Sequence, residues 1–348
     1  MLELLKNKVG EWLSGGPQGD VVVSSRVRLA RNIAGYPFLT KISPQEVTRI
    51  EELLREKILS LDLSQGLVYY RVSELDALLR EVLVERQLMA RDLAGATWPG
   101  GVAFSPDERL SLMINEEDHL RVQVIYGGFQ LQKAWQEVNR VDDALAEVVP
   151  FAFSAKYGYL AACPTNVGTG MRASVMVHLP AMVMAREMDK LVELAQRHRL
   201  AVRGLYGEGT PASADFYQIS NQVTLGITEQ DILEQVSKAI WEVISIERST
   251  RENLSRLHST KLQGRLALAL EMLANATAIS SEEALHLLSQ VRMGVEMNLL
   301  KDVRPEALNE LMLLTLPAHL QTMEGRRLAS LRRNKVRADY IKRKLHLN

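Results

Sequence analysis

The apolar residues of this 348-residue chain follow two different patterns, and the change comes close to residue 250. Before that point, runs with apolar residues at every second position alternate with stretches of helical period. From about Thr260 onward, only helical patterns remain. Neither a single sheet nor a single helical bundle accommodates both patterns. We therefore predict an α+β domain over residues 1–255 and an all-helical domain over residues 256–348.

The α+β domain contains several runs that are typical of strands. Two of them, Leu110–Asn115 and Leu120–Tyr126, are separated by only four residues, which predicts an antiparallel hairpin. We therefore expect a mostly antiparallel sheet flanked by helices, in preference to a doubly wound parallel sheet. The other predicted strands are Val21–Leu29, Tyr159–Cys163, Leu200–Leu205 and Phe216–Ser220.

Helical patterns lie between these strands and throughout the second domain. Residues 43–61 offer Ser43 as N-cap and Glu46 to complete a capping box. A second amphipathic helix is expected over residues 179–199. The C-terminal domain is rich in Leu, Ala, Met, Glu and Arg, which favour helices. Its apolar content exceeds what a few isolated helices can hide, so we expect a homodimer.

Composition excludes several classes of protein. Lys and Arg together equal Asp and Glu at 42 each, so no net charge directs the chain to nucleic acid or to a membrane. No apolar run is long enough to span a bilayer, and the N-terminus is not typical of a signal peptide. The single cysteine, Cys163, excludes an internal disulfide and fits a reducing compartment. We expect a cytoplasmic protein.

The stretch "DVVVSSRVRLAR" predicts a strand with two neighbouring arginines on one face. Ser24 shares the face of Arg26 and Arg28, and the other face carries Ser25, Val27 and Leu29. Two adjacent arginines repel each other unless an anion lies across them. The pair either faces water on an edge strand or faces an anionic ligand.

The predicted hairpin tip holds three consecutive acids, at residues 116–118, with His119 and Arg121 beside them. Such a tip is either a solvated loop or a place for a general base or a clamp for a cationic substrate. A metal site is less favoured there, because no second His or Cys has the spacing of a metal ligand.

The stretch "AACPTNVGTGMRASVMVHLP" contains Gly168, Gly170 and Ala173 in the spacing of a dinucleotide-binding fingerprint. The match is weak, because no βαβ unit surrounds it, and the chain has no P-loop motif. What remains is a Gly-rich loop that places Arg172 near an anion at a helix start. Cys163 is either a buried small hydrophobic residue or a thiolate beside a positive site.

The stretch "VRGLYGEGTPASADFYQISN" follows a predicted strand that ends near Arg203, and it contains Glu208 between two glycines. It is either an ordinary flexible loop or a mobile lid. Several arginines therefore lie at strand ends or in loops, together with the carboxylates Glu117 and Glu208. Such a set suits a nucleoside triphosphate and a cationic acceptor. The arginines are Arg26, Arg28, Arg121, Arg172 and Arg203.

The motifs "SSRVRLAR", "NEEDHLR", "CPTNVGTGMRAS" and "RGLYGEG", in this order, resemble those of the phosphagen kinases, which are ATP:guanidino phosphotransferases. The resemblance implies a catalytic domain with an antiparallel sheet flanked by helices. It also implies that Glu117 and Glu208 grip a guanidinium, with Cys163 beside it. Gln87 stands where a nucleotide-contacting histidine is expected. The nucleotide site implied by the resemblance consists of Ser24, Ser25, Arg26, Val27, Arg28, Gln87, Arg121, Arg172, Ala173, Ser174, Val175, Met176, Arg203, Gly204, Leu205, Tyr206, Gly207 and Glu208.

The order of the domains resembles that of the bacterial protein-arginine kinases of the McsB type. Phosphagen kinases carry a helical domain before their first motif, whereas here the first motif begins at Ser24 and a helical domain comes last. An acceptor site without that domain would admit a protein side chain. The resemblance also implies a phosphoarginine pocket with the motif RDxxRA, present here as "RNKVRA". Arg333, Arg337 and Ala338 match the motif, and Asn334 replaces the acid.

The resemblance thus implies a kinase that transfers the γ-phosphoryl group of Mg·ATP to arginine side chains of proteins and marks them for a Clp protease in stress regulation. Glu117 would be the base, Glu208 a second clamp, and Cys163 would orient the guanidinium. Mg²⁺ would be held by the nucleotide and water, with no metal site on the protein, and an activator protein is expected. Two alternatives stay open: a kinase of free arginine or another small guanidino compound, and a non-catalytic adaptor that binds phosphoarginine proteins or nucleic acid.

Overall fold

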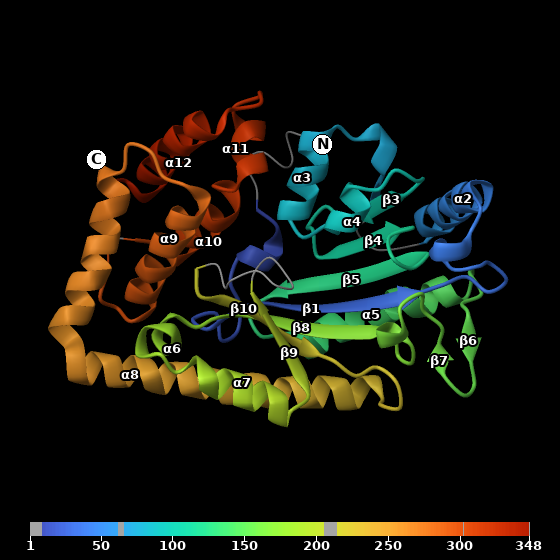
Figure 1. The fold of residues 1–348 in the computed structure, drawn as a ribbon, viewed down its shortest axis with the longest axis horizontal. Helices are drawn as coiled ribbons and strands as arrows, with labels where there is room; N and C mark the ends of the chain where they lie inside the picture. Colours follow the sequence, from blue (N-terminus) through green and yellow to red (C-terminus); the bar gives the residue numbers. More distant parts are fainter. Residues whose placement is uncertain (1–8, 62–65, 205–213, 302, 348) are drawn as a thin grey trace.

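The computed structural model describes residues 9–61, 66–204, 214–301 and 303–347. Its main element is an eight-stranded sheet in the order β2-β3-β4-β5-β1-β8-β10-β9, in which all neighbouring strands are antiparallel (Figure 1). The predicted antiparallel sheet flanked by helices is therefore confirmed. The strands are β1 (Val22–Arg31), β2 (Val68–Arg71), β3 (Gly101–Phe104), β4 (Leu110–Ile114), β5 (Leu120–Gly127), β6 (Phe153–Ser154), β7 (Gly158–Tyr159), β8 (Met171–His178), β9 (Leu200–Gly204) and β10 (Phe216–Asn221).

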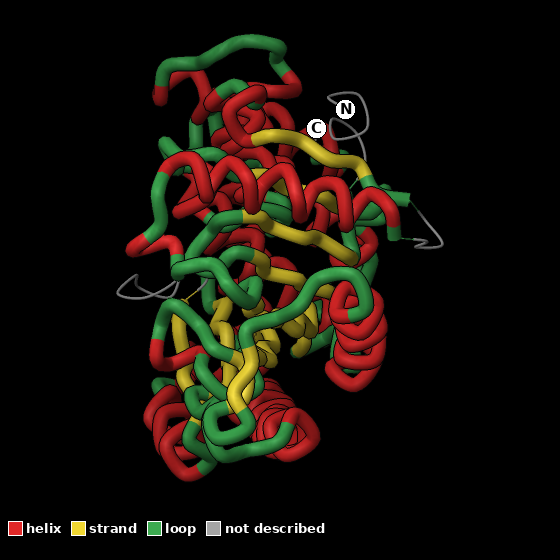
Figure 2. Tube along the Cα trace, turned by 90° about the vertical axis from the view of Figure 1, so that its right-hand side faces the viewer, coloured by secondary structure: helices red, strands yellow, loops and turns green. Residues whose placement is uncertain are grey.

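Helices flank the sheet and make up the whole C-terminal part (Figures 1 and 2). Within the described ranges, none of them is both long and apolar enough to cross a membrane. The helices are α2 (Pro44–Ser60), α3 (Ala77–Glu85), α4 (Arg91–Ala94), α5 (Leu131–Ala146), α6 (Pro180–Ala185), α7 (Met188–Arg197), α8 (Glu229–Asn275), α9 (Ser281–Glu296), α10 (Pro305–Leu314), α11 (Pro317–Met323) and α12 (Ser330–Leu345).

One face of the sheet forms the main hydrophobic core with α5 and the first half of α8. On β1 this face carries Val27 and Leu29, both fully buried. They belong to one hydrophobic cluster with Val138 of α5 and Ile240 of α8. Because side chains alternate along a strand, the residues between them must point to the other face.

The other face is covered by α3 and α4 at the end formed by β3 and β4. Val102 and Met113 of these strands are buried in a second cluster with Val82 and Leu83 of α3. Ala318 of α11 joins the same cluster, so a helix from the C-terminal part packs on the sheet-containing part. Farther along this face, at β1, β8 and β10, polar side chains replace the apolar ones.

Helix α8 connects the two parts of the chain. It has 47 residues, and its backbone leaves the helical conformation at His258 (φ −138°, ψ 28°). Beyond this kink, Leu273 packs in a separate cluster with Leu288 of α9 and Leu308 of α10. The kink lies close to the predicted domain boundary at residue 255, which stays a prediction.

Two local predictions are confirmed. The predicted hairpin is formed by β4 and β5, with Ile114 paired to Leu120 next to the acidic tip. The capping box of α2 is also present. Ser43 Oγ accepts from the backbone N–H of Glu46 at 3.3 Å, and the Glu46 carboxylate accepts from the backbone N–H of Ser43 at 3.1 Å.

Three local predictions are wrong. The stretch after Gly170 is strand β8 and not the start of a helix, because sheet pairing on both sides outweighs the local glycine signal. The helix expected over residues 179–199 is broken into α6 and α7 at Arg186, whose φ is 60°. Of the strand predicted from Tyr159 to Cys163, only Tyr159 belongs to a strand, and a 3₁₀ turn with Pro164 in its first position follows Cys163.

Candidate active site

The register of the sheet gathers the predicted arginines on one face. Arg28 of β1 lies opposite Arg172 of β8, and Arg203 of β9 lies opposite Gln218 of β10. Directly opposed residues of antiparallel strands point to the same side. Following these pairs across β5, β1, β8, β10 and β9 brings all the predicted arginines to the side opposite the main core. We call this side the arginine face, defined by Arg26, Arg28, Arg121, Arg172 and Arg203.

Arg26 is held by neutral acceptors. Its Nη1 donates to Gln87 Oε1 at 3.0 Å and its Nη2 donates to Gln218 Oε1 at 2.8 Å. Burial, and then the positive charges of Arg172 and Arg121, lower the pKa of Arg26 to about 10. These amides orient the guanidinium but leave its charge uncompensated.

Arg28 has the least balanced surroundings of the arginine face. Burial lowers its pKa well below the ordinary value, and the neighbouring charges of Arg26, Arg121 and Arg172 act in the same direction. Its Nε is buried and has no hydrogen-bond partner among the described residues. An unsatisfied buried donor among like charges is the feature that a bound anion would correct.

The acidic hairpin tip lies beside these arginines. Glu116 is buried, and its carboxylate accepts from both Nη atoms of Arg121 at 2.7 Å. Burial raises the pKa of Glu116 although Arg121 opposes the shift. Glu117 points outward: its side chain is 44% exposed and lies 3.5 Å from Arg121 Nη2. Asn166 Nδ2 donates to Glu117 at 3.2 Å.

The loop that contains Cys163 is tied to this tip. Asp118 Oδ1 accepts from the backbone N–H of Ala162 at 2.7 Å and from Asn32 Nδ2 at 2.7 Å. The half-buried Cys163 has its Sγ 3.0 Å from Thr165 Oγ1. Because Asn166, in the same turn, reaches Glu117, the predicted base and the predicted thiol lie on two segments in direct contact.

The remaining predicted residues are divided between the two faces and the ends of the sheet. Ser24, Ser174 and Met176 share the arginine face, whereas Ser25, Val27, Ala173 and Val175 point toward the core. Ser25, for example, donates to the carbonyl of Gly128 at 2.9 Å. Gly204 ends β9. Leu205, Tyr206, Gly207 and Glu208 lie outside the described residues.

Some polar residues of the arginine face were not predicted. Gln218 and Ser220 of β10 point into it, and Ser220 Oγ accepts from Arg172 Nη2 at 3.3 Å. Glu116 balances charge there, although the sequence singled out its neighbour Glu117. The alternation of polar and apolar residues in "FYQISN" is the signal that would have found the pair on β10.

The predicted phosphoarginine pocket lies on α12. Arg337 is buried; its Nε donates to the carbonyl of Thr315 at 2.8 Å and its Nη1 donates to Asn334 Oδ1 at 2.9 Å. Arg333 Nη1 donates to the carbonyl of Leu328 at 2.9 Å, whereas its Nε is buried without a hydrogen-bond partner in the described structure. Ala338 is buried in the helical core.

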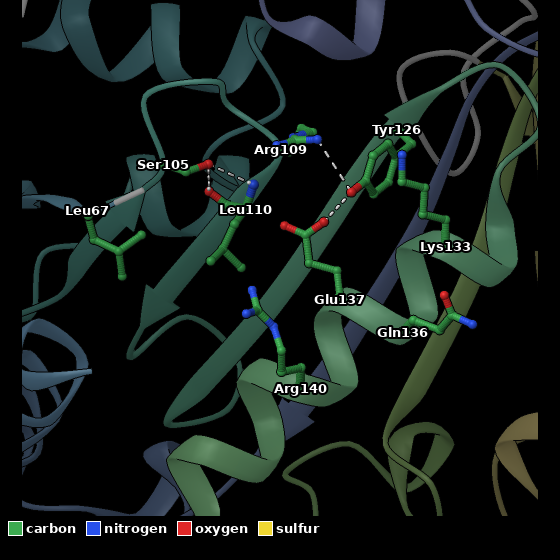
Figure 3. A pocket seen from close by; sticks show the side chains of 10 residues that line it. Leu67, Ser105, Arg109, Leu110, Tyr126, Lys133, Gln136, Glu137 and Arg140 are labelled. Atoms are coloured by element: carbon green, nitrogen blue, oxygen red, sulfur yellow. Dashed lines mark hydrogen bonds between the residues drawn. The ribbon is translucent and has the colours of Figure 1, made fainter. Parts of the chain in front are cut away.

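A cavity of about 370 Å³ opens elsewhere, between α5 and the strands β4 and β5 (Figure 3). In it, Tyr126 donates to the carboxylate of Glu137, and burial followed by Glu137 raises the pKa of Tyr126 to about 12. Arg109, Lys133 and Arg140 also line it. No predicted site residue is among its lining residues, because it lies on the core side of the sheet. In the described ranges, no group of three His, Cys, Asp or Glu side chains could hold a metal ion.

Known protein families match nearly the whole chain. Residues 49–250 match the family described as ATP:guanido phosphotransferase, C-terminal catalytic domain, and residues 259–348 match the protein-arginine kinase McsB C-terminal domain. The protein-arginine kinase of Halothermothrix orenii is 42% identical over 352 positions, which cover 99% of each chain. That of Bacillus pumilus is 40% identical and covers 99% of this chain and 95% of its own.

Solved structures share the fold of the sheet-containing part. Lombricine kinase has a TM-score of 0.61 at 25% identity, covering 72% of this chain and 71% of its own. The duplicated taurocyamine kinase from Schistosoma mansoni, with bound transition state analog components, has a TM-score of 0.63 at 29% identity. That match covers 71% of this chain and 35% of the kinase.

Proposed function

Since the chain belongs to the protein-arginine kinase family, we propose that its arginine face binds the phosphates of ATP for transfer to arginine side chains of proteins. The observation that carries this proposal is the buried Nε of Arg28, which has no hydrogen-bond partner within the described ranges and lies in a cluster of like charges. Triphosphate oxygens accept the bidentate contacts that guanidinium groups offer, and their charge offsets the mutual repulsion of the arginines.

The acceptor guanidinium would enter at the hairpin tip. An arginine side chain stays protonated up to a pH of about 12, so its nitrogens are poor nucleophiles until a base removes a proton. Glu117 is the base in this proposal, because it is exposed next to the arginine face. Glu208, outside the described residues, is proposed as the second clamp. Cys163 would orient the guanidinium without forming a covalent bond.

The transfer balances as an in-line displacement. The bond between the γ-phosphorus and its bridging oxygen breaks and leaves ADP, while a guanidinium nitrogen bonds to phosphorus and gives one proton to Glu117. The arginine face stabilises the charge on the transferring group, and each such contact is worth about 3 kcal/mol in comparable sites. Mg²⁺, bound to nucleotide oxygens and water, supplies further charge compensation.

Phosphoryl transfer from Mg·[γ-³²P]ATP tests this proposal directly. A mixed protein substrate is offered in one reaction and free arginine in another. We expect label on protein that is lost in acid but stable in base, and no label with Glu117→Gln. The matched control is Glu137→Gln, a carboxylate of the cavity on the core side, which should transfer at the rate of the unmodified enzyme.

The alternatives predict other outcomes of the same experiment. Label on free arginine alone would identify a kinase of a small guanidino compound. Phosphoarginine binding that needs no ATP, with no transfer to either acceptor even after addition of an activator, would identify an adaptor. Binding to nucleic acid would weaken steeply with salt.

We also propose that α12 carries a phosphoarginine-binding pocket built from Arg333, Asn334, Arg337 and Ala338. The Nε of Arg333, which has no partner in the part of the chain that the structure describes, supports it, because a phosphoryl oxygen would satisfy this donor. Asn334 offers an amide where the motif has an acid, so the guanidinium end would be bound more weakly. Titration with free phosphoarginine should show weaker binding to Arg333→Ala, whereas the exposed neighbour Arg332→Ala should bind normally.

The remaining proposals concern assembly and context. Leu257, Leu268 and Met272 on α8 are 64%, 53% and 51% exposed, which supports a homodimer formed by the domain over residues 256–348. Leu268→Glu should lower the mass measured by light scattering. We further propose an activator protein, a cytoplasmic location, and a role of the product in marking proteins for a Clp-type protease during stress.

A further inference from the structure

We infer that His319, in helix α11 of the C-terminal part, is a positioning residue for the nucleotide site. It acts through Glu85, Arg86 and Gln87, which are consecutive at the end of α3, and it holds Gln87 against Arg26. The inference rests on the proposed function, because Arg26 is taken there to bind ATP.

Glu85 makes the first link between the two parts. Its carboxylate accepts from the backbone N–H of Ala318 at 2.8 Å and from that of His319 at 3.0 Å. Its Oε2 also lies 2.6 Å from Nδ1 of His319. These contacts fix the start of α11 on the end of α3, and the two helices lie side by side (Figure 1).

Arg86 binds the other nitrogen of the same ring. It is fully buried, with Nη2 2.5 Å from Glu108 Oε1 and Nη1 3.3 Å from Nε2 of His319. A guanidinium only donates, so Nε2 accepts, and Nδ1 carries the proton that is donated to Glu85. The imidazole is thus fixed at both nitrogens, between a carboxylate and a guanidinium.

Gln87 follows these two residues in a left-handed conformation, with φ at 62°. Its Oε1 accepts from Arg26 Nη1 at 3.0 Å, and its backbone carbonyl accepts from the side-chain amide of Gln123. A side chain other than glycine keeps a positive φ only when its surroundings hold it there. Glu85 and Arg86 supply that support, and the imidazole of His319 contacts both of them in addition to their bonds with the start of α11 and with Glu108.

The consequence concerns the orientation of Arg26. Gln87 and Gln218 are the neutral acceptors that aim its guanidinium along the arginine face. When His319 no longer fixes Glu85 and Arg86, Gln87 loses its fixed position and Arg26 gains rotational freedom. Ordering that side chain again on binding lowers the affinity for ATP, while the transfer step in the loaded enzyme keeps its geometry.

A double-mutant cycle on nucleotide affinity tests the inference. The dissociation constant of Mg·AMP-PNP is measured by calorimetry for the unmodified full chain, for His319→Ala, for Gln87→Ala and for the double variant. We expect His319→Ala to weaken binding about tenfold, corresponding to one lost hydrogen bond to a charged group. In the Gln87→Ala background, the same change should weaken binding less than about twofold. KM for ATP should rise in parallel, whereas kcat at saturating ATP should stay within about twofold of the value for the unmodified enzyme.

His198→Ala is the matched control, since His198 Nε2 lies 3.0 Å from Glu242 in another histidine–glutamate contact that does not involve Gln87. It should bind the nucleotide normally. If His319→Ala does not fold, Glu85→Gln replaces it in the cycle, because the amide keeps the size and removes one acceptor. Unchanged affinity in a folded variant, or an equal effect with and without Gln87, would overturn the inference. Affinity that does not respond to Arg28→Met would instead overturn the proposed nucleotide site.

Discussion

Two sets of arginines in this molecule differ in the partners that surround them. We call Arg31 and Arg251 the structural group, because each is a buried guanidinium that meets a buried carboxylate: Arg31 lies 2.8 Å from Asp142 and Arg251 lies 2.8 Å from Glu247. On the arginine face, Arg26 and Arg28 face other arginines, and amides stand where carboxylates could have been. The difference separates the positive charges that are paired within the fold from those that we propose bind a ligand.

The two groups also differ in what their removal should do. Breaking a buried ion pair leaves an uncompensated charge, which costs about 3 to 5 kcal/mol. Removing one of several mutually repelling charges relieves strain in the unliganded protein. Substitutions on the arginine face should therefore lower activity without lowering stability. Substitutions in the structural group should lower stability, while the protein that stays folded keeps its activity.

The largest effect is expected for Arg28→Met, which keeps most of the side-chain volume and removes the charge. The kcat/KM for ATP should fall about a thousandfold or more, equivalent to about 4 kcal/mol. The free energy of unfolding without nucleotide should stay unchanged or rise, because burial, and then the neighbouring like charges, lower the pKa of this guanidinium in the folded protein. Steady-state kinetics and urea unfolding on one preparation measure both; a large loss of stability would break the comparison.

Asp142→Ala tests the structural group. It leaves Arg31 buried without a carboxylate among the described residues, with the carbonyls of Ala30 at 2.9 Å and Thr169 at 3.0 Å and the ring of Tyr159 as neutral partners. Unfolding should therefore become easier by about 3 to 5 kcal/mol. Urea unfolding measures the change, and the fraction that remains folded should keep its affinity for ATP. The double variant Arg31→Met with Asp142→Leu should recover most of the stability. A double variant as unstable as the single one would contradict the charge explanation.

The sequence made the arginine face predictable because period-two alternation separates it from the core within single strands. Arg26 and Arg28 alternate with Val27 and Leu29, and the register of the antiparallel sheet places the arginines of the neighbouring strands on the same face. Strand β8 was missed although Arg172 alternates in the same way. The glycines before it gave a stronger local signal than the pairing with β1 and β10, which only the folded chain supplies.

Other features of the site are invisible in the sequence for a physical reason. Glu85 and His319 are 234 positions apart, and neither stands in a pattern that marks it as functional. Their contact depends on how α11 packs on α3, which is decided by tertiary burial of residues such as Ala318. Motifs report local geometry, so contacts between the two parts of the chain could not be predicted.

His178 sharpens the comparison, because it is a buried, neutral neighbour of Arg251, which is paired with Glu247. Burial, and then Arg292 and Arg251, lower its pKa well below the ordinary value. Its Nε2 lies 2.8 Å from Ser289 Oγ, which donates to Asp215 at 2.8 Å. Protonation would add a further cation beside Arg292, whose Nη1 is buried without a hydrogen-bond partner in the described structure.

The sign follows from proton binding. Below a pH of about 6.5 the unfolded chain takes up a proton at this histidine and the folded chain does not, so stability falls as the pH falls. The contribution is complete above pH 6.5 and decreases by about 1.4 kcal/mol per pH unit below it. Urea unfolding between pH 7 and 5 should show a shallower loss for His178→Gln. Equal slopes for the two proteins would show that this histidine titrates normally.

The smallest effect is expected for Asn334→Asp, which gives the buried Arg337 a carboxylate partner like those of the structural group. Asn334 Oδ1 already accepts from Arg337 at 2.9 Å, and a carboxylate in the same place turns that contact into a charge-assisted one. We expect about 1 kcal/mol of added stability in urea unfolding at neutral pH. Phosphoarginine should also bind more tightly, since its guanidinium gains an acidic partner. A stabilised variant with unchanged phosphoarginine affinity would place Arg337 among the structural arginines and remove it from the proposed pocket.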